Sequence, residues 1–241
     1  MLHAGGATLT DYAQAAAKLA LRVLRALDGA GDPDPLAGYV DAAADPKAAL
    51  AAVRVLGADA LAAHVLTGRP LTQAEAETVA EAAHVFPLTA ACDPDTAHIT
   101  RWRDWATAQA AARCSPPAPD PPRPDHAGPA APAGACAWRS WSVTMAQLST
   151  LALPGLDSAV HEAARQGAVP LARGTCWAIL RRDYALAARL GRWLALVHGQ
   201  GAAVPLDPAP LLDHLLLFGG VEARTVLEAE IARHLLKGNH T

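Results

Sequence analysis

The sequence lacks the motifs that identify most large enzyme classes. Its 241 residues contain no glycine-rich phosphate loop, dinucleotide-binding glycine motif, serine-nucleophile elbow, zinc-protease motif or calcium-binding loop. It also has no aspartate-rich run of the kind that binds a metal diphosphate. These absences weigh against several enzyme classes, identify no cofactor, and leave open whether the chain is an enzyme.

Cysteine is scarce, and its spacing excludes the common zinc motifs. Cys92, Cys114, Cys136 and Cys176 form no Cys-x-x-Cys pair. The first residues show no basic segment followed by an apolar core, and no run reaches the ~18 apolar residues of a membrane helix. We therefore expect a cytoplasmic protein that does not enter the membrane, with free and mostly buried thiols.

Charge is low, and lysine is especially rare. Charged residues make up 18% of the chain, the net charge is −3, and Lys18, Lys47 and Lys237 are the only lysines among 20 basic residues. Together with abundant alanine, glycine and proline, this composition is typical of a GC-rich bacterial genome. Residues 1–134 carry 10 basic and 15 acidic residues and residues 135–241 carry 10 and 8, so the charge disfavours nucleic acid as a partner.

Proline is concentrated in one segment. Residues 115–134 contain 8 of the 19 prolines, a composition that forbids helix and cannot build a core. We predict an extended, solvated linker there. It would separate an N-terminal helical domain, residues 1–114, from a C-terminal helical domain, residues 135–241.

Strand signals are nearly absent, which predicts an all-α fold. Aromatic residues make up 5% of the chain, and no run alternates between polar and apolar residues. We expect two helical subdomains, or two halves of one helical bundle, joined by the proline-rich linker. A capping box from Thr72 to Glu75 opens a helix that ends near Phe86, and Asp93 or Asp95 caps one that runs to about Arg113. The other expected helices span residues 9–28, 35–44, 46–56, 58–67, 138–153, 156–167, 175–198, 207–218 and 221–237.

The segment 174–198 carries most of the candidate chemistry. Treated as one helix, it places four arginines within an arc of about 100°. These arginines are Arg181, Arg182, Arg189 and Arg192. Such a face suits the carboxylate or phosphate of a small anionic ligand or an acidic partner surface, and it also suits plain solvation.

Asp183 falls on the opposite, apolar side of the same wheel. Buried there, it would be a candidate acid, base or ligand with a shifted pKa, and Tyr184 and His198 would be its neighbours. The alternative is that Asp183 caps a second helix beginning at Tyr184. The sequence leaves both interpretations open.

Three histidines complete the candidates. His214 lies in a leucine-rich helix and is a further acid–base candidate. Glu230 and His234 have the i,i+4 spacing of a metal-chelating pair or of a weak surface contact. Glu81 and His84 have the spacing used in di-iron bundles, but the helical wheel places them on a solvated face.

Two functional hypotheses follow. The first is a bacterial, cytoplasmic, all-helical binding or accessory protein that acts through an apolar or arginine-bearing interface, with a protein partner or as a homodimer. The alternative is a small-molecule enzyme of bacterial specialised metabolism with a pocket in a helical bundle. Asp183 and a histidine would then serve as acid–base groups, and arginines would hold an anionic substrate.

Overall fold

The described part of the chain is built of helices alone, which confirms the all-α prediction. The computed structural model describes residues 8–32, 34–88, 93–115, 120–124, 128–132, 137–220 and 222–238. The α-helices are α1 Leu9–Leu27, α2 Pro46–Leu56, α3 Ala62–Thr67, α4 Gln73–Val85, α5 Pro94–Cys114, α6 Trp138–Gln147, α7 Ala159–Gln166, α8 Ala168–Leu180, α9 Tyr184–Gly199, α10 Pro208–Phe218 and α11 Ala223–Lys237. Two short 3-10 helices are η1 Gly57–Leu61 and η2 Ser149–Leu151.

Side-chain caps begin the helices where the sequence predicted them. The Thr72 hydroxyl accepts a hydrogen bond from the Glu75 N–H, and the Glu75 carboxylate accepts one from the Thr72 N–H, so the capping box at α4 is confirmed. Asp93, rather than Asp95, caps α5 by accepting from the Thr96 N–H at 3.0 Å. These local signals set the helix starts to within a residue or two.

Several expected helices differ from the structure. The helix expected over 58–67 is the 3-10 helix η1 followed by α3, and α8 begins at Ala168 rather than at 175. Residues 35–42 form turns rather than a helix. The helix expected over 138–153 ends at Gln147, and η2 follows it. The single helix expected over 175–198 is wrong, because the chain breaks between α8 and α9.

The break between α8 and α9 has a clear local cause. Arg182 lies in the left-handed region with a φ of 58°, which no continuous α-helix contains. Asp183 then caps α9 by accepting a hydrogen bond from the Leu186 N–H at 3.0 Å. Of the two interpretations of Asp183, the structure therefore shows the helix cap.

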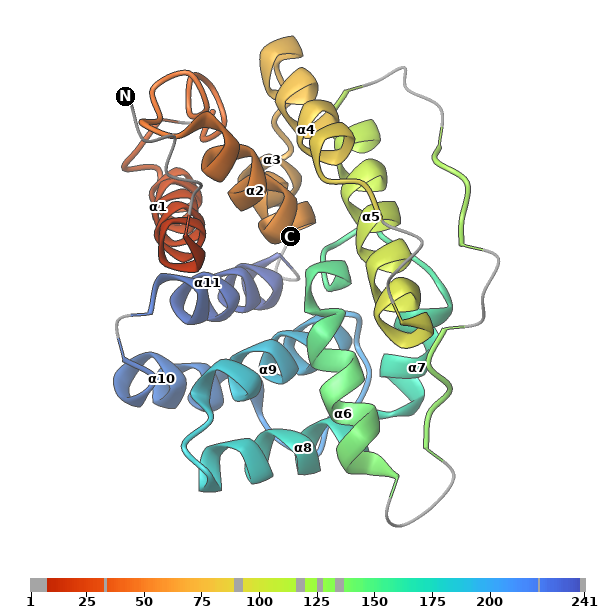
Figure 1. The fold of residues 1–241 in the computed structure, drawn as a ribbon. Helices are drawn as coiled ribbons and strands as arrows, with labels where there is room; N and C mark the ends of the chain where they lie inside the picture. The colour runs from red at the N-terminus through yellow and green to blue at the C-terminus, as the bar shows by residue number, and fades with distance from the viewer. Residues whose placement is uncertain are drawn as a thin grey trace.

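One hydrophobic core runs through both halves of the chain. Figure 1 shows how helices of the two halves pack against one another. Helix α11, from the end of the chain, lies between α1 and α9 and packs on both of them. In the C-terminal half, the fully buried Trp193 of α9 joins α9 to α6 by donating its indole N–H to the Met145 carbonyl at 2.8 Å. The halves thus share a core, and the separate two-domain arrangement is not confirmed.

The described parts of the proline-rich segment touch the helical body. The Gln109 amide donates to the Asp120 carboxylate at 2.9 Å, and the Trp141 indole donates to the Pro129 carbonyl at 3.4 Å. Gly128 lies so close to Ala159 that a Cβ at this position would approach its backbone to 2.9 Å. Residues 120–124 and 128–132 are free of helix, as the proline content predicted.

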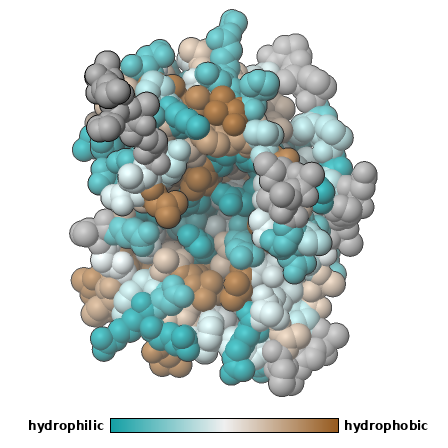
Figure 2. Space-filling model, in the orientation of Figure 1, coloured by the Kyte–Doolittle hydropathy of each residue, from teal (hydrophilic) through white to brown (hydrophobic). Residues whose placement is uncertain are grey.

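One described segment, Pro46–Thr67, is long and apolar enough to cross a membrane. Its most apolar window is 78% buried inside the protein, and core helices of soluble proteins pass the same test. Figure 2 shows hydrophilic residues spread over one face of the molecule, with apolar residues in separate patches. Of the thiols, Cys114 is buried and Cys176 is exposed, whereas Cys92 and Cys136 lie outside the described residues.

Buried His161 predicts a loss of stability in acid. Its Nε2 donates to the Leu151 carbonyl and its Nδ1 accepts from the Ser158 hydroxyl, and burial lowers the pKa of the ring from 6.5 to about 4. The unfolded chain therefore binds a proton below pH 6.5 that the folded chain accepts only near pH 4. Between pH 7 and pH 4.5 this histidine should remove about 2.5 kcal/mol of folding free energy.

Urea unfolding at the two pH values measures this loss. His161→Gln provides the reference, because glutamine keeps an amide that donates and accepts but does not titrate. The difference between the two proteins isolates the histidine from the carboxyl groups that titrate in the same range. Equal pH dependence in both proteins would refute the assignment.

Candidate anion-binding site

A buried ion network lies at the junction of the two halves. Arg192 of α9 is fully buried and donates from one NH1 to the Asp59 carboxylate at 2.7 Å and to the Glu228 carboxylate at 2.9 Å. Its Nε donates to the Ala152 carbonyl at 2.9 Å. A buried charge is tolerated when it is paired and hydrogen-bonded in this way.

Local backbone structure places the two carboxylates. Helix α2 ends at Leu56, its C-cap Gly57 has a φ of 59°, and the η1 turn that begins there directs Asp59 into the core. Glu228 lies in the middle of α11, where the Ser149 hydroxyl donates to its second carboxylate oxygen at 2.9 Å. Burial raises the pKa of Glu228, but the charges of Arg192 and its neighbours outweigh this effect and lower it.

Three further arginines surround this network. Arg189 lies one turn before Arg192, with its Nε 3.8 Å from the Glu228 carboxylate. Arg224 lies one turn before Glu228, with an NH2 3.7 Å from the Asp59 carboxylate. Arg103 of α5 donates to the Val55 carbonyl at 2.6 Å, and Arg224 donates to the same carbonyl at 3.3 Å. Two guanidinium groups therefore converge on one oxygen.

The three arginines line one cavity of about 660 Å³. The first turns of α5, the end of α6 and the η2 turn form the rest of its wall. Hydroxyl and amide groups predominate there, from Thr96, Thr100, Thr144, Gln147, Ser149 and Thr150. This volume lies within the range of small-molecule sites, about 300 to 1,000 Å³.

Positive charge exceeds negative charge around this site, where Arg192 is fully buried and the three arginines of the cavity wall are partly buried. Four guanidinium groups, those of Arg103, Arg189, Arg192 and Arg224, face two described carboxylates, Asp59 and Glu228. The pKa of Arg103 is lowered, mainly by burial and to a smaller extent by repulsion from Arg224. Asp95 also lines the cavity but is exposed, so water screens it. The described guanidinium groups therefore exceed the two buried carboxylates by two positive charges.

Donors in the site are also left without acceptors. The Nε atoms of Arg103 and Arg224 and the Thr150 hydroxyl are buried and have no hydrogen-bond partner within the described protein. In the adjoining network the Arg192 NH2 group also lacks a partner, as does the Asp59 Oδ2 acceptor, which lies 3.7 Å from the Arg224 NH2 group. Buried donors in proteins are nearly always satisfied, so each of these requires an explanation. A ligand that carries acceptor oxygens would supply the missing partners.

The predicted four-arginine face is divided by the helix break. Arg189 lines the cavity and Arg192 lies beneath it. Arg181 and Arg182 are exposed at the turn between α8 and α9, where Arg181 lies 5.0 Å from the centre of the Trp177 ring. The wheel was wrong for these two because the chain changes direction at Arg182.

The predicted acid–base residues are not gathered into one site. Asp183 is an exposed cap, and His198 is exposed about 22 Å away along α9, at a rise of 1.5 Å per residue. Tyr184 and His214 do approach each other, with ring centres 6.4 Å apart, and His214 stacks on Phe218. None of these four residues lines the arginine cavity as described.

The predicted metal pair has other contacts. Glu230 accepts a hydrogen bond from Arg233 at 3.2 Å, and His234 is half-buried, which together with Lys237 lowers its pKa. Glu81 and His84 are exposed, as the helical wheel predicted. Within the described chain, a set of three potential metal ligands occurs elsewhere, at Asp34, His64 and Glu75.

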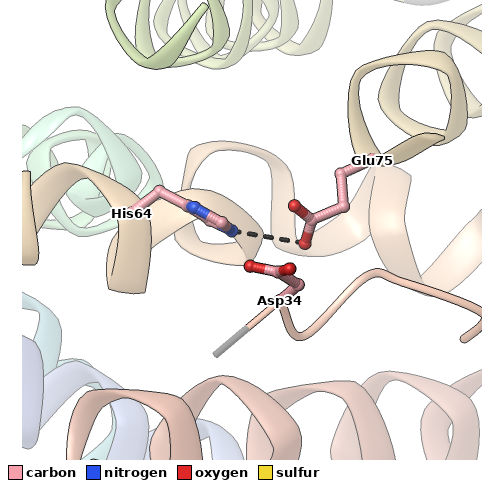
Figure 3. Close-up of side chains that lie close together, drawn as sticks. All are labelled: Asp34, His64 and Glu75. Carbon is pink, nitrogen blue, oxygen red and sulfur yellow. Dashed lines mark hydrogen bonds and ion pairs between the residues drawn. The ribbon is translucent and has the colours of Figure 1, made fainter. Parts of the chain in front are cut away.

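Asp34, His64 and Glu75 brace α3, α4 and the loop after α1 (Figure 3). Both ring nitrogens of the fully buried His64 face oxygen atoms, the Pro70 carbonyl and the Glu75 carboxylate, each at 3.2 Å. Glu75 also accepts from the Leu36 and Thr72 N–H groups and the Thr72 hydroxyl, and Asp34 accepts from Arg69 at 3.0 Å. Burial raises the pKa of Glu75, but the bonds from His64 and the backbone outweigh it. Because these oxygens already have donors, we assign the cluster a structural role.

Sequence reasoning missed Arg103, Arg224, Asp59 and Glu228. They lie in three elements, η1, α5 and α11, and the pairs they form join residues far apart in the chain. One signal was available for two of them, since Arg224 and Glu228 are spaced i,i+4 within the final predicted helix.

Comparison with known proteins adds no relative to this geometry: no protein-family model, curated protein or solved structure matches the chain.

Proposed function

We propose that this protein binds a small anionic ligand in the arginine cavity. The observation that supports the proposal is the convergence of Arg103, Arg189 and Arg224 on one cavity above a network in which guanidinium groups outnumber carboxylates. A guanidinium group presents several N–H donors in a plane and is the usual partner of carboxylate and phosphate. The proposal shares the binding role with the first hypothesis and the arginine contacts to a small anion in a pocket with the second.

Energetics support an anion in this position. Removing a charge from water without a counter-charge is costly, and like charges at close range increase that cost. A fold that gathers excess positive charge around a partly buried cavity therefore gains free energy when an anion enters. The same low-dielectric surroundings strengthen each contact that the anion makes.

The enzyme hypothesis has less support from the geometry. Asp183, Tyr184, His198 and His214 lie outside the walls of the arginine cavity as described. A role in binding or regulation needs only the positive cavity. A protein partner or a homodimer, a bacterial source and a cytoplasmic location stay predictions.

Thermal unfolding in the presence of anions tests the proposal. With citrate or inorganic phosphate at about 100 times the dissociation constant, the protein should gain about 2.7 kcal/mol of stability. For a chain of this size that gain corresponds to a rise in Tm of about 5 to 10 °C. Chloride at matched ionic strength serves as the reference for general salt effects.

Two variants locate the effect. Arg189→Gln should abolish most of the rise in Tm, because Arg189 lines the cavity and its contact to Glu228 is long at 3.8 Å. Arg173→Gln, at an exposed position on α8 outside the cavity, should keep the full rise. The proposal fails if neither anion raises Tm above chloride, or if both variants respond equally.

A further inference from the structure

We infer that the anion is the phosphate group of a phosphorylated sugar or polyol. The inference rests on the proposed function and specifies its ligand. It draws on the number and arrangement of the arginines, the charge excess, and the chemistry of the remaining cavity wall.

The arginines surround the site from three directions. Arg103 comes from α5, Arg189 from α9 and Arg224 from α11, and the shared bond to the Val55 carbonyl holds Arg103 and Arg224 side by side. A phosphate group presents three terminal oxygens in a tetrahedral arrangement, one for each guanidinium. A carboxylate presents two oxygens in one plane, so it matches three convergent forks less well.

The charge excess matches a phosphate monoester. The four described guanidinium groups exceed the two buried carboxylates by two charges. A phosphate monoester carries about −1.5 to −2 charges at pH 7, because its second pKa is about 6. A single carboxylate or a phosphodiester carries one charge and would leave the site half compensated.

The rest of the cavity fits a hydroxylated body. A volume of about 660 Å³ exceeds what one phosphate group fills. Thr96, Thr100, Thr144 and Gln147 offer hydroxyl and amide groups, and the Thr150 hydroxyl is buried without a partner. The described lining contains no tryptophan, tyrosine or phenylalanine on which a nucleobase would stack, and its one aromatic ring is the small imidazole of His98. The wall therefore favours a sugar or polyol over a nucleotide.

Isothermal titration calorimetry with five probes tests the inference. Ribose 5-phosphate should bind at least 100-fold more tightly than ribose and at least tenfold more tightly than inorganic phosphate. AMP, which adds a base to the same sugar phosphate, should bind no more tightly than ribose 5-phosphate. Citrate should bind more weakly than ribose 5-phosphate at equal ionic strength.

The pH dependence tests the charge on the ligand. Between pH 7 and pH 5, the dianionic share of a phosphate monoester falls about tenfold, given a second pKa of about 6. The affinity for ribose 5-phosphate should fall by about the same factor. Sulfate, which stays a dianion over this range, should show no comparable loss.

A variant that preserves the charge completes the test. Thr150→Val removes a hydroxyl that has no partner within the described fold, so the variant should unfold at an unchanged or higher temperature. It should bind ribose 5-phosphate about five- to tenfold more weakly. Unchanged affinity would show that the ligand does not reach this hydroxyl and would overturn the assignment of this donor.

The outcomes separate the two levels of the argument. If citrate binds more tightly than every phosphate and Arg189→Gln abolishes its binding, the proposed function stands and the phosphate inference is wrong. If AMP binds tenfold more tightly than ribose 5-phosphate, the sugar or polyol assignment is wrong. If none of the anions binds at low salt, both the inference and the proposed function are wrong.

Discussion

Replacing Arg192 by alanine should lower the free energy of unfolding by about 3 to 5 kcal/mol. Arg192 is fully buried and donates to Asp59, Glu228 and the Ala152 carbonyl. Without it, two carboxylates remain in the interior with Arg189 and Arg224 only at longer range, 3.8 and 3.7 Å. A stability of 5 to 15 kcal/mol is typical of globular domains, so this loss would remove a large share of it.

Urea unfolding of the variant measures this effect, and two comparisons make it specific. Arg173→Ala, at an exposed position of α8, should change the stability by less than about 0.5 kcal/mol. Adding Asp59→Asn and Glu228→Gln to Arg192→Ala should recover part of the loss, because the unpaired charges are then removed. A loss below 1 kcal/mol for Arg192→Ala would mean that water reaches this network.

Local chemistry explains why most helices were predictable. Most starts have a side-chain cap within a few residues, as with Thr72 and Glu75 at α4 or Asp207 before Pro208 at α10, whereas α3, α6, α8 and α11 begin without one. The helical period of apolar residues supplies the rest. The turns over residues 35–42 were missed because the apolar spacing resembles a helix, whereas the Leu36 N–H is instead bonded to Glu75 in a distant helix.

The α8–α9 break shows where periodicity fails. Apolar residues continue in helical order on both sides of Arg182, so a wheel drawn over 174–198 has no means of registering a change of direction. The wheel consequently placed Asp183 among apolar residues, whereas the structure exposes it as a cap. The cap itself was readable from the residue type, but choosing it required the backbone angle at Arg182.

The candidate site was hidden for a different reason. Arg192 and Asp59 are 133 residues apart, and the sequence contains no signal that pairs them. An arginine in an amphipathic helix is most often solvated, so the sequence alone favours exposure of Arg192 and Arg103. In the structure, helices from the other half of the chain bury Arg192 fully and Arg103 partly. Only the tertiary packing of α5, α9 and α11 brings the arginines together.

Arg103→Met should weaken ligand binding at least 100-fold, about 2.7 kcal/mol, yet leave the ligand-free protein as stable as before or about 1 kcal/mol more stable. Under the proposed function Arg103 serves the ligand rather than the fold, so the two effects are expected to have opposite signs. Burial and the neighbouring Arg224 disfavour its charge, as its lowered pKa indicates. The Val55 carbonyl keeps a donor in the variant, since Arg224 also bonds to it at 3.3 Å.

Calorimetry with ribose 5-phosphate and urea unfolding without ligand measure the two effects on the same protein. Arg103→Lys is the matched comparison, because lysine keeps the positive charge but lacks the planar guanidinium group. This variant should retain the repulsion between residue 103 and Arg224 in the ligand-free protein. It should bind the ligand less tightly than the parent protein does. A site maintained for stability would behave in the opposite way, with Arg103→Met losing several kcal/mol of folding free energy. That result would make Arg103 part of the structural network around Arg192. If Arg103→Met instead loses affinity and keeps its stability, the charge of Arg103 is one that the fold retains for its ligand.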